Sequence, residues 1–403
     1  MALVTDLEVP QFDYVDPELR GPRFHERMRE LHAGNWIARS ELGWFVLDRE
    51  AVEFFLKSRK LTFPGLRLAE LFGITEGPLY EEIQRNILTI DGDDHRRLRN
   101  LVNPALTARA VEKYRPAMRG FLEDLVGGFE ASGRCELVDD LCKPYPALTI
   151  ATVMGAPLDD AQRLYDWSNW IQRQFAADLY EQRERIEQAV LEFYDYAHAL
   201  LEQRRREPGD DLISALNTAR YEGDRLSDVE LVNLVLNILV GGVDTTQSQL
   251  AHAVRLLAEH PDQWALLADR PELAPQAVEE ALRHEPIVPF TARIAVEEVE
   301  YRDVTFPEGT IVMLSAWNAN HDDRDYEFDI TAPRDAKPLT FGAGIHYCLG
   351  ANVARAEMQE ALAYLPQRMP GLELDGEPEL DSITGIYGVR ALPVRWDQAA
   401  AAA

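Results

Sequence analysis

Residues 341–350 read FGAGIHYCLG and place Cys348 in a glycine-rich loop just before a segment of helical character. Glycine allows positive φ and a close approach of the backbone to another group, so its clustering around one sulfur indicates a constrained loop. The three cysteines of the chain cannot all pair and match no zinc-binding spacing. We therefore expect Cys135 and Cys142 to be ordinary core thiols, with Cys348 serving another purpose.

Four interpretations of Cys348 compete. A structural core thiol would not need Gly342, Gly344 and Gly350 around it. A nucleophile activated by His346 is excluded because side chains two apart in a tight loop point away from each other, although a distant histidine remains open. A zinc ligand would need companions. A thiolate ligand of haem iron fits the glycines, which let the backbone approach the macrocycle, and the N–H groups after the cysteine, which point at the sulfur.

The rest of the chain reads as mostly helical. Helical periodicity dominates from about residue 16 to residue 285. Strand-like stretches are short: residues 36–48 predict a hairpin, and residues 299–314 and 387–396 predict small sheets near the end. The sequence therefore predicts a mainly α fold with small β-sheets.

One predicted helix, at residues 226–259, has an unusual centre. Ser227 is a suitable cap, with glutamate at the third helical position, and the middle is apolar on nearly every face, which indicates burial. Residues 241–246, GGVDTT, interrupt it with two glycines that each cost roughly 1 kcal/mol relative to alanine. Taken alone, the stretch is explained equally well by a tolerated kink whose threonines bond to the preceding turn.

The cysteine loop resembles the haem-ligand loop of the cytochrome P-450 haem-thiolate monooxygenases, whose pattern Phe-x-x-Gly-x-x-x-Cys-x-Gly it matches at every specified position. Residues 94–99 (DHRRLR), 241–246 (GGVDTT) and 280–283 (EALR) resemble further motifs of that family, in its order and spacing. The resemblance covers essentially the whole chain. It implies the cytochrome P-450 fold, with haem between the long central helix and the cysteine loop with its following helix.

The resemblance also implies haem b as cofactor, with Cys348 as the iron ligand. Haem carries two propionates, which need cationic or donor side chains near them. By resemblance these side chains are His95, Arg99, Arg293 and His346, while Gly241, Phe341, Gly342 and Gly350 contact the macrocycle. The family commonly has Asp-Pro-Pro-Glu-His where residues 91–95 read DGDDH. The start of that helix, and with it the position of His95, therefore departs from the family pattern.

Glu280 and Arg283 lie three residues apart and share one face of a helix, so they can form a bidentate pair. Alone, such a pair is usually part of a solvated helix face. The resemblance implies a buried pair that supports the core behind the cysteine loop.

The implied reaction at a C–H bond is RH + O2 + NAD(P)H + H⁺ to ROH, water and NAD(P)⁺, and the same insertion of one oxygen atom at a C=C bond is also implied. A thiolate ligand favours O–O cleavage, and the leaving oxygen must receive two protons. We expect Thr245 to hydrogen-bond the oxygen being activated and Asp244 to relay protons. Peroxide-driven oxidation, oxidative coupling, decarboxylation and a non-catalytic haem sensor or carrier remain alternatives, but the acid-alcohol pair favours monooxygenation.

The expected substrate cavity is apolar. Asn237 and Val240 share a helix face with Asp244, so Asn237 either hydrogen-bonds a substrate oxygen or pairs with a neighbouring helix. The resemblance adds to the lining Ile287, Val288, Pro289, Phe290, Ile386 and Tyr387. The motifs look most like those of camphor-type, small-terpenoid hydroxylases, so a terpenoid or similarly compact hydrophobic molecule is expected, with steroids, fatty acids and polyketides left open.

The net charge of the chain limits the classes of macromolecule that it can bind. Asp and Glu outnumber Lys and Arg by 69 to 41, and the net charge of −28 argues against nucleic acid or anionic membrane as partners. Arg96 and Arg97 are expected on the cysteine side of the haem, as a dock for an acidic electron-transfer protein. The resemblance implies a ferredoxin or flavodoxin with its reductase, since no reductase-like stretch follows.

The remaining expectations concern organisation and location. The start of the chain has neither a basic segment nor an apolar run, so a cytoplasmic protein without a signal peptide or membrane anchor is expected. Apolar residues, 46% of the chain, are spread evenly without a linker. We expect one unit over residues 1–396, a low-complexity tail over residues 397–403, and a monomer.

Overall fold

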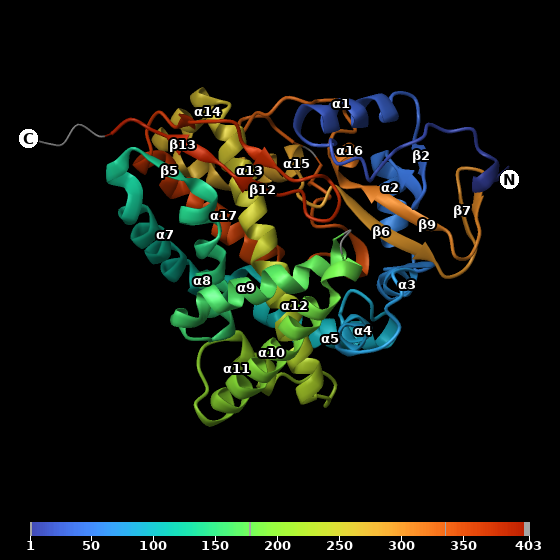
Figure 1. The fold of residues 1–403 in the computed structure, drawn as a ribbon, viewed down its shortest axis with the longest axis horizontal. Coiled ribbons are helices and arrows are strands. Elements are labelled where there is room, and N and C mark those ends of the chain that lie inside the picture. Colours follow the sequence, from blue (N-terminus) through green and yellow to red (C-terminus); the bar gives the residue numbers. More distant parts are fainter. Residues whose placement is uncertain (1, 177–178, 335, 399–403) are drawn as a thin grey trace, which may run out of the picture.

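Helices dominate the fold, as expected, in the computed structural model, which describes residues 2–176, 179–334 and 336–398. In Figure 1 the helices fill the left and lower parts, and most strands gather at the right, beside the N-terminus. The α-helices are α1 (Gly21–His32), α2 (Arg49–Lys57), α3 (Gly65–Leu71), α4 (Pro78–Arg85), α5 (Gly92–Val102), α6 (Ala108–Val111), α7 (Arg115–Phe129), α8 (Pro144–Met154), α9 (Ala161–Gln172), α10 (Leu179–Arg206), α11 (Leu212–Thr218), α12 (Asp228–Gly242), α13 (Asp244–Ala258), α14 (Pro261–Asp269), α15 (Ala274–His284), α16 (Ala316–Asn320) and α17 (Ala351–Arg368).

The strands form small sheets that join distant parts of the chain. The largest has the order β2 (Ile37–Ser40), β3 (Gly43–Val46), β9 (Ile311–Ser315), β6 (Phe290–Ala295), β4 (Leu61–Thr62). The others are β1 (Ala2–Leu3) with β8 (Val304–Phe306) and β7 (Val299–Tyr301); β10 (Glu373–Leu374) with β13 (Pro393–Arg395) and β5 (Arg134–Glu136); and β11 (Glu379–Leu380) with β12 (Val389–Ala391).

The predicted hairpin at residues 36–48 is confirmed, since β2 and β3 pair antiparallel. The two other predicted segments do contain strands, but each segment contributes to two different sheets. In residues 299–314, β7 pairs with β8 while β9 joins the largest sheet. In residues 387–396, β12 pairs with β11 and β13 pairs with β10 and β5. The pairing of β9 and β13 therefore depends on long-range packing, whereas β2 with β3 and β7 with β8 are local hairpins.

The predicted central helix is present as α12 and α13, which cross the middle of the molecule (Figure 1). Ser227 Oγ accepts from the Glu230 N–H and the Glu230 carboxylate accepts from the Ser227 N–H, a reciprocal cap. Val243, with φ −91° and ψ −71°, joins the two helices. At Gly242 an added Cβ would lie 2.4 Å from Cδ1 of Ile150, so the glycine allows α12 to pack tightly against α8.

This helix is also apolar enough to resemble a membrane span. By length and composition alone, the 31 residues Asp228–Ala258 could cross a bilayer, with a mean hydropathy of 1.4 in the most apolar window. However, 61% of that window is buried inside the fold. This degree of burial is what a helix running through a protein core requires.

The largest cluster of buried apolar side chains surrounds the central helix and includes residues of α5, α7 to α10, α15, α17 and the last strands. A second cluster lies between the largest sheet and α2. At the C-terminus, the Asp397 N–H donates to Pro370 O, and Gln398 Nε2 donates to Ala131 O. The first two residues of the predicted tail are therefore attached to the fold, and residues 399–403 lie outside the described part.

Candidate functional site

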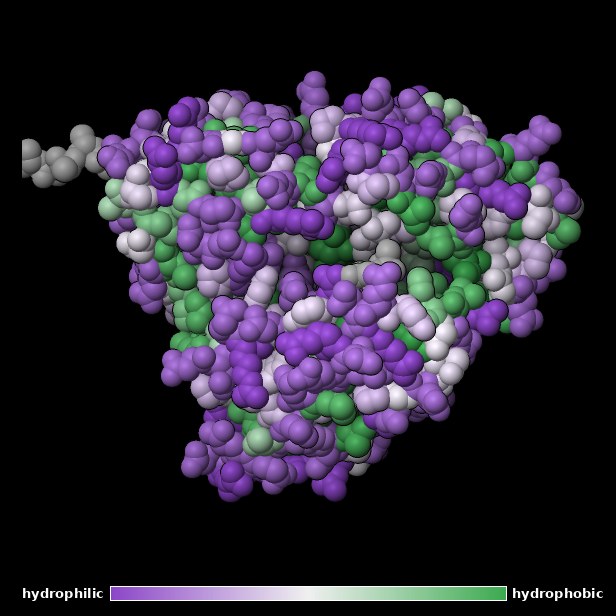
Figure 2. All heavy atoms as spheres, in the orientation of Figure 1, coloured by the Kyte–Doolittle hydropathy of each residue, from purple (hydrophilic) through white to green (hydrophobic). Residues whose placement is uncertain are grey.

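A cavity of about 360 Å³ lies between the central helix and the cysteine loop. Its wall contains Cys348 and residues of α12, α13, α17, β6 and the segment before α5. Figure 2 shows that this face of the molecule is hollowed between the helical and the sheet-rich parts, with hydrophobic residues inside the hollow. The motifs at residues 94–99, 241–246 and 341–350 thus meet around one space.

The cysteine loop has the backbone that its glycines indicate. Gly342 and Gly344 have φ of +69° and +73°, a region that L side chains rarely adopt. At Gly344 an added Cβ would also lie 2.7 Å from Leu56 O. The Cys348 N–H donates to Phe341 O at 2.9 Å, which closes the loop at the start of α17.

Groups around the Cys348 sulfur partly offset the unfavourable effect of burial on a thiolate. Burial raises the pKa of the Cys348 thiol, but the N–H groups of Gly350 and Ala351 and the charges of Arg99 and Arg355 act in the opposite direction. The N–H groups lie at the N-terminal end of α17, where helix dipoles favour negative charge. The sulfur therefore faces the cavity with donors behind it, the arrangement of an anionic metal ligand.

Four cationic or potentially cationic side chains lie along the cavity wall: His95, Arg99, Arg293 and His346. Arg293 and His95 are 5% and 3% exposed, and among the described residues neither they nor Arg99 has a carboxylate at ion-pair distance. Burial lowers the pKa of Arg293 to about 10. Burial, with the nearby charges of His346 and Arg99, lowers the pKa of His95 to about 4.

The buried guanidinium group of Arg293 has no carboxylate at ion-pair distance among the described residues, which is unusual in a chain of net charge −28. Of the four side chains, His346 does have such a partner, because its Nε2 lies 3.0 Å from Asp91 Oδ1. Arg99 donates to Tyr347 O at 2.7 Å, and Arg293 to Ala292 O at 2.8 Å, so both guanidinium groups meet only neutral acceptors. This part of the cavity wall, formed by His95, Arg99, Arg293 and His346 and here called the cationic edge, therefore fits a group that brings its own negative charges, as the two propionates of haem would.

The central helix supplies the opposite wall. Gly241, Gly242, Thr245 and Thr246 line the cavity. An added Cβ on Gly241 would meet no protein atom within 4 Å and would project into the open space of the cavity. The Thr245 hydroxyl donates back to Gly241 O. A flat group can thus lie close to the helix at this point.

Asp244 does not line the cavity. Its side chain is 7% exposed, and its Oδ2 accepts from Ser168 Oγ of α9 at 3.3 Å. Its Oδ1 has no hydrogen-bond partner among the described residues. Burial raises the pKa of Asp244 to about 7, although Ser168 and Asn169 stabilise the charged form. The carboxyl group is therefore poised to carry or release a proton near neutral pH.

The expected substrate lining is only partly present. Asn237, Val240, Ile287 and Val288 line the cavity, as does the apolar segment Ile87–Leu88. Asn237 Oδ1 accepts from the Ile87 N–H at 3.0 Å, and its Nδ2 donates to Glu82 at 3.3 Å. Of the two roles open to Asn237, the structure shows pairing with neighbouring elements.

Four expected lining residues require correction: Pro289, Phe290, Ile386 and Tyr387 are not among the residues that line the cavity. Phe290 and Tyr387 instead belong to an aromatic cluster on the far side of β6, with ring centroids 6.3 Å and 5.8 Å from that of Phe24. Tyr387 is fully buried, and its hydroxyl accepts from the Gly21 N–H at 2.7 Å. Phe290 and Tyr387 therefore face the core and not the cavity.

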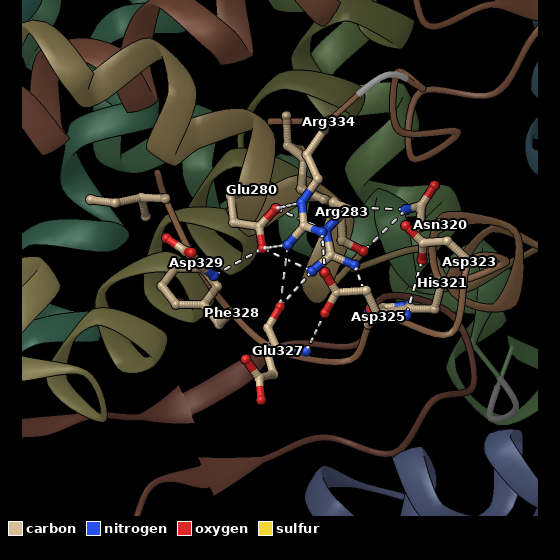
Figure 3. Close-up of polar contacts among 12 residues, drawn as sticks. Glu280, Arg283, Asn320, His321, Asp323, Asp325, Glu327, Phe328, Asp329 and Arg334 are labelled. Atoms are coloured by element: carbon tan, nitrogen blue, oxygen red, sulfur yellow. Dashed lines mark hydrogen bonds and ion pairs between the residues drawn. The ribbon is translucent and has the colours of Figure 1, made fainter. Parts of the chain in front are cut away.

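The Glu280–Arg283 pair is buried and bidentate, with both contacts at 2.8 Å (Figure 3). Arg334, which the sequence did not indicate, also binds Glu280, at 3.1 Å and 2.9 Å. Arg283 further donates to the carbonyl oxygens of Asp325 and Glu327. Burial would raise the pKa of Glu280, but the two guanidinium groups lower it overall. The pair ties α15 to the segment that leads into the cysteine loop.

The predicted basic surface of α5 is smaller than expected. Arg97 binds Glu230 and Asp224, the latter at 3.2 Å, so its charge is compensated within the fold. Arg96 is 67% exposed and contacts Asp93 at 3.1 Å. Of the two arginines, only Arg96 presents its side chain freely to a partner.

The comparisons with known proteins agree with this geometry. The family profile of cytochrome P450 matches residues 74–370. Luteothin monooxygenase of Streptomyces thioluteus is 36% identical over 400 residues, 97% of each chain. Mycinamicin IV hydroxylase/epoxidase of Micromonospora griseorubida is 39% identical over 325 residues, 78% of this chain and 81% of that protein. The solved structure of CalO2 has a TM-score of 0.88 and 30% identity, covering 97% of this chain and 100% of that one.

Proteins of this family carry a haem iron, use O2 with electrons from redox partners, and act on hydrophobic molecules. The extent of these matches, together with the cysteine loop under the cavity, shows the same for this protein. The chain belongs to the cytochrome P450 family and is a haem-thiolate monooxygenase.

Proposed function

We propose that Cys348 holds the iron of haem b, and one observation carries this assignment. The sulfur faces the cavity with the N–H groups of Gly350 and Ala351 directed at it. Bound haem supplies the iron that binds O2 and, through its thiolate ligand, the electron density that favours O–O cleavage. Phe341 and Gly342, beside the cysteine, and Gly241, on the opposite wall, would contact the faces of the macrocycle.

The propionates are assigned to the cationic edge. His95, Arg99, Arg293 and His346 line the cavity and, apart from His346, meet no carboxylate among the described residues. Charge-assisted hydrogen bonds to a propionate would satisfy the guanidinium groups of Arg99 and Arg293. Glu280 and Arg283 are proposed to act indirectly, by holding the segment before the cysteine loop in place.

Proton delivery is assigned to Asp244 and Thr245. The Thr245 hydroxyl lies on the cavity side and, on turning away from Gly241 O, can donate to oxygen held in the cavity. Asp244 lies behind it with a pKa of about 7, so it is partly protonated at neutral pH. This matches the requirement that a general acid have a pKa near the working pH.

The proposed substrate is a hydrophobic secondary metabolite. Support comes from the apolar lining around Val240, Ile287 and Val288 and from the relatives, whose names refer to luteothin and mycinamicin IV. The compact terpenoid suggested by the motifs stays the second candidate. Asn237, which is occupied within the fold, is no longer the proposed polar contact to substrate.

The proposed setting is a monomer in the cytoplasm that receives electrons from a ferredoxin, or a flavodoxin, and its reductase. Arg96, exposed on α5 next to the cysteine loop, is the proposed contact for an acidic partner. Residues 1–396 are proposed as one haem domain, with residues 397–403 as a short tail.

The test is a reconstitution with a bacterial ferredoxin, its reductase and NAD(P)H under isotopically labelled O2, with a library of secondary metabolites as candidate substrates. Binding is detected first as a low-spin to high-spin shift of the Soret band. Monooxygenation predicts one labelled oxygen atom in the product. Product whose new oxygen comes from water would contradict the proposed chemistry.

A further inference from the structure

Residues 78–88, here called the roof segment, comprise α4 and the three residues Asn86, Ile87 and Leu88 that line the cavity. Its helix α4 packs on α10 through a small apolar cluster that includes Leu79 and Ile83. Ile87, by contrast, is 5% exposed and belongs to the main core cluster. A helix held by few apolar contacts can open locally while the rest of the fold stays intact.

The contact between the roof segment and the central helix is polar. Asn237 of α12 accepts from the Ile87 N–H at 3.0 Å and donates to Glu82 Oε1 at 3.3 Å. The same Oε1 accepts from Asn86 Nδ2 at 2.9 Å, and Asn86 Oδ1 accepts from the Leu88 N–H at 3.0 Å. Glu82 therefore holds both amides in the orientations that bind the backbone of the roof segment.

Glu82 is fully buried, yet it has no ion-pair partner among the described residues. Its Oε2 has no hydrogen-bond partner in the described part of the chain. The titratable or charged groups near it are Tyr194 of α10, which accepts from Asn233 at 3.0 Å, and Arg85 and Glu81, which pair with each other on α4. On α12 only the neutral amides of Asn233 and Asn237 face the network.

A buried carboxylate without a cation is costly, whereas a buried neutral acid costs much less. Burial accordingly raises the pKa of Glu82 to about 7, although Asn86 and Asn237 stabilise the charged form. When the roof segment lifts from α12, Glu82 meets water, and its pKa returns toward the ordinary value of 4.5.

We propose that Glu82 is a positioning residue whose proton uptake is coupled to closure of the roof segment over the substrate cavity, with Asn237 as its partner on the central helix. The inference rests on the proposed function only in taking this cavity as the substrate cavity. Below about pH 4.5 Glu82 is protonated in both arrangements, so closure is most favourable there. Between about pH 4.5 and about pH 7, closure weakens roughly tenfold per pH unit, and above that range it changes no further.

The test is amide hydrogen exchange of the haem-loaded protein without substrate, read at Ile87 and Leu88 and corrected for the intrinsic exchange rate at each pH. We expect their protection to fall roughly tenfold per pH unit between about pH 5 and about pH 7, and then to level off. Glu82→Gln keeps the acceptor oxygen but cannot ionise, so its protection should not depend on pH. Glu81→Gln, at an exposed position of the same helix, should behave as the wild type.

The inference is overturned if Glu82→Gln shows the same pH dependence as the wild type. It is also overturned if protection in the wild type is flat, a result that needs no folded variant. Asn237→Leu should lower protection at Ile87 at every pH, and unchanged protection there would remove Asn237 from the account. Exchange is read without turnover, so a failed assignment of the reaction or its substrate would leave this result standing, and a flat profile would leave the proposed function untouched.

Discussion

Asp244 and Thr245 are adjacent in the sequence, but their side chains have different surroundings. Thr245 lines the cavity, whereas Asp244 is buried against Ser168 of α9. In the proposed relay, a proton from Asp244 would therefore have to travel from the α9 side of the helix to the cavity side. This separation implies that the two residues fail in different ways when they are replaced.

Thr245→Ala should uncouple the reaction. The variant is expected to bind substrate and consume NAD(P)H at a rate comparable to the wild type, while oxygen leaves as hydrogen peroxide, because no hydroxyl steadies it on the cavity side. The measurement is NAD(P)H consumed, peroxide formed and product formed, with redox partners in excess. Thr245→Ser should restore coupling. Full coupling in Thr245→Ala would show that Thr245 takes no part in oxygen activation.

Asp244→Asn should slow NAD(P)H consumption itself, by roughly 10²-fold, the lower end of the usual contribution of general acid-base catalysis. In the wild type the pKa of about 7 predicts a rate that declines as the pH rises above neutrality, because the protonated fraction of Asp244 falls. The decline should be absent in Asp244→Asn. A wild-type rate and pH profile in the variant would show that the proton takes another route.

Arg293→Leu should weaken haem retention. The guanidinium group is 5% exposed, without a carboxylate partner among the described residues, so a propionate is the counter-charge that its position requires. A hydrogen bond to a charged group is worth about 1.5–3 kcal/mol, which corresponds to roughly 10- to 100-fold faster haem loss. Transfer of haem to excess apomyoglobin measures this rate. Arg59→Leu, outside the cavity lining, is the control, and equal loss rates would refute the assignment.

Glu280→Gln should lower the free energy of unfolding, although Glu280 does not line the cavity. Removing the charge leaves Arg283 buried without its carboxylate and takes one of two carboxylates from the half-buried Arg334, and breaking a buried ion pair typically costs about 3–5 kcal/mol. Chemical denaturation of the haem-loaded protein measures the loss. Glu272→Gln, whose partner Arg270 is exposed, should leave the denaturation midpoint unchanged. If both variants have the same denaturation midpoint, Glu280, Arg283 and Arg334 do not stabilise the fold as a group.

Local rules were sufficient where a motif lies within one element. The cap at Ser227 and the pair of Glu280 with Arg283 depend on spacing within a helix turn, and both were predicted from sequence. The cysteine loop attracted attention because its glycines surround the cysteine within ten residues. Arg334, by contrast, lies 54 residues after Glu280, in a segment without periodicity, and no local signal joins the two.

The cavity wall was harder to predict, because it depends on which way each strand and loop faces. Phe290 and Tyr387 were expected in the cavity but pack against the aromatic cluster around Phe24. Glu82 was missed, although it shares one face of α4 with the buried Leu79 and Ile83, a position at which an acid would have been a signal. Whether that face is buried depends on α10, far away in the sequence.

The most direct test of the central claim is the reduced carbon monoxide spectrum of the wild type and of Cys348→Ser, each loaded with haem. A neutral oxygen ligand should not give the red-shifted Soret band that is specific to a thiolate. The account predicts that the wild type shows this band and that Cys348→Ser lacks it while still retaining haem through the cationic edge. A wild type that binds no haem, or a red-shifted band that survives in Cys348→Ser, would contradict it.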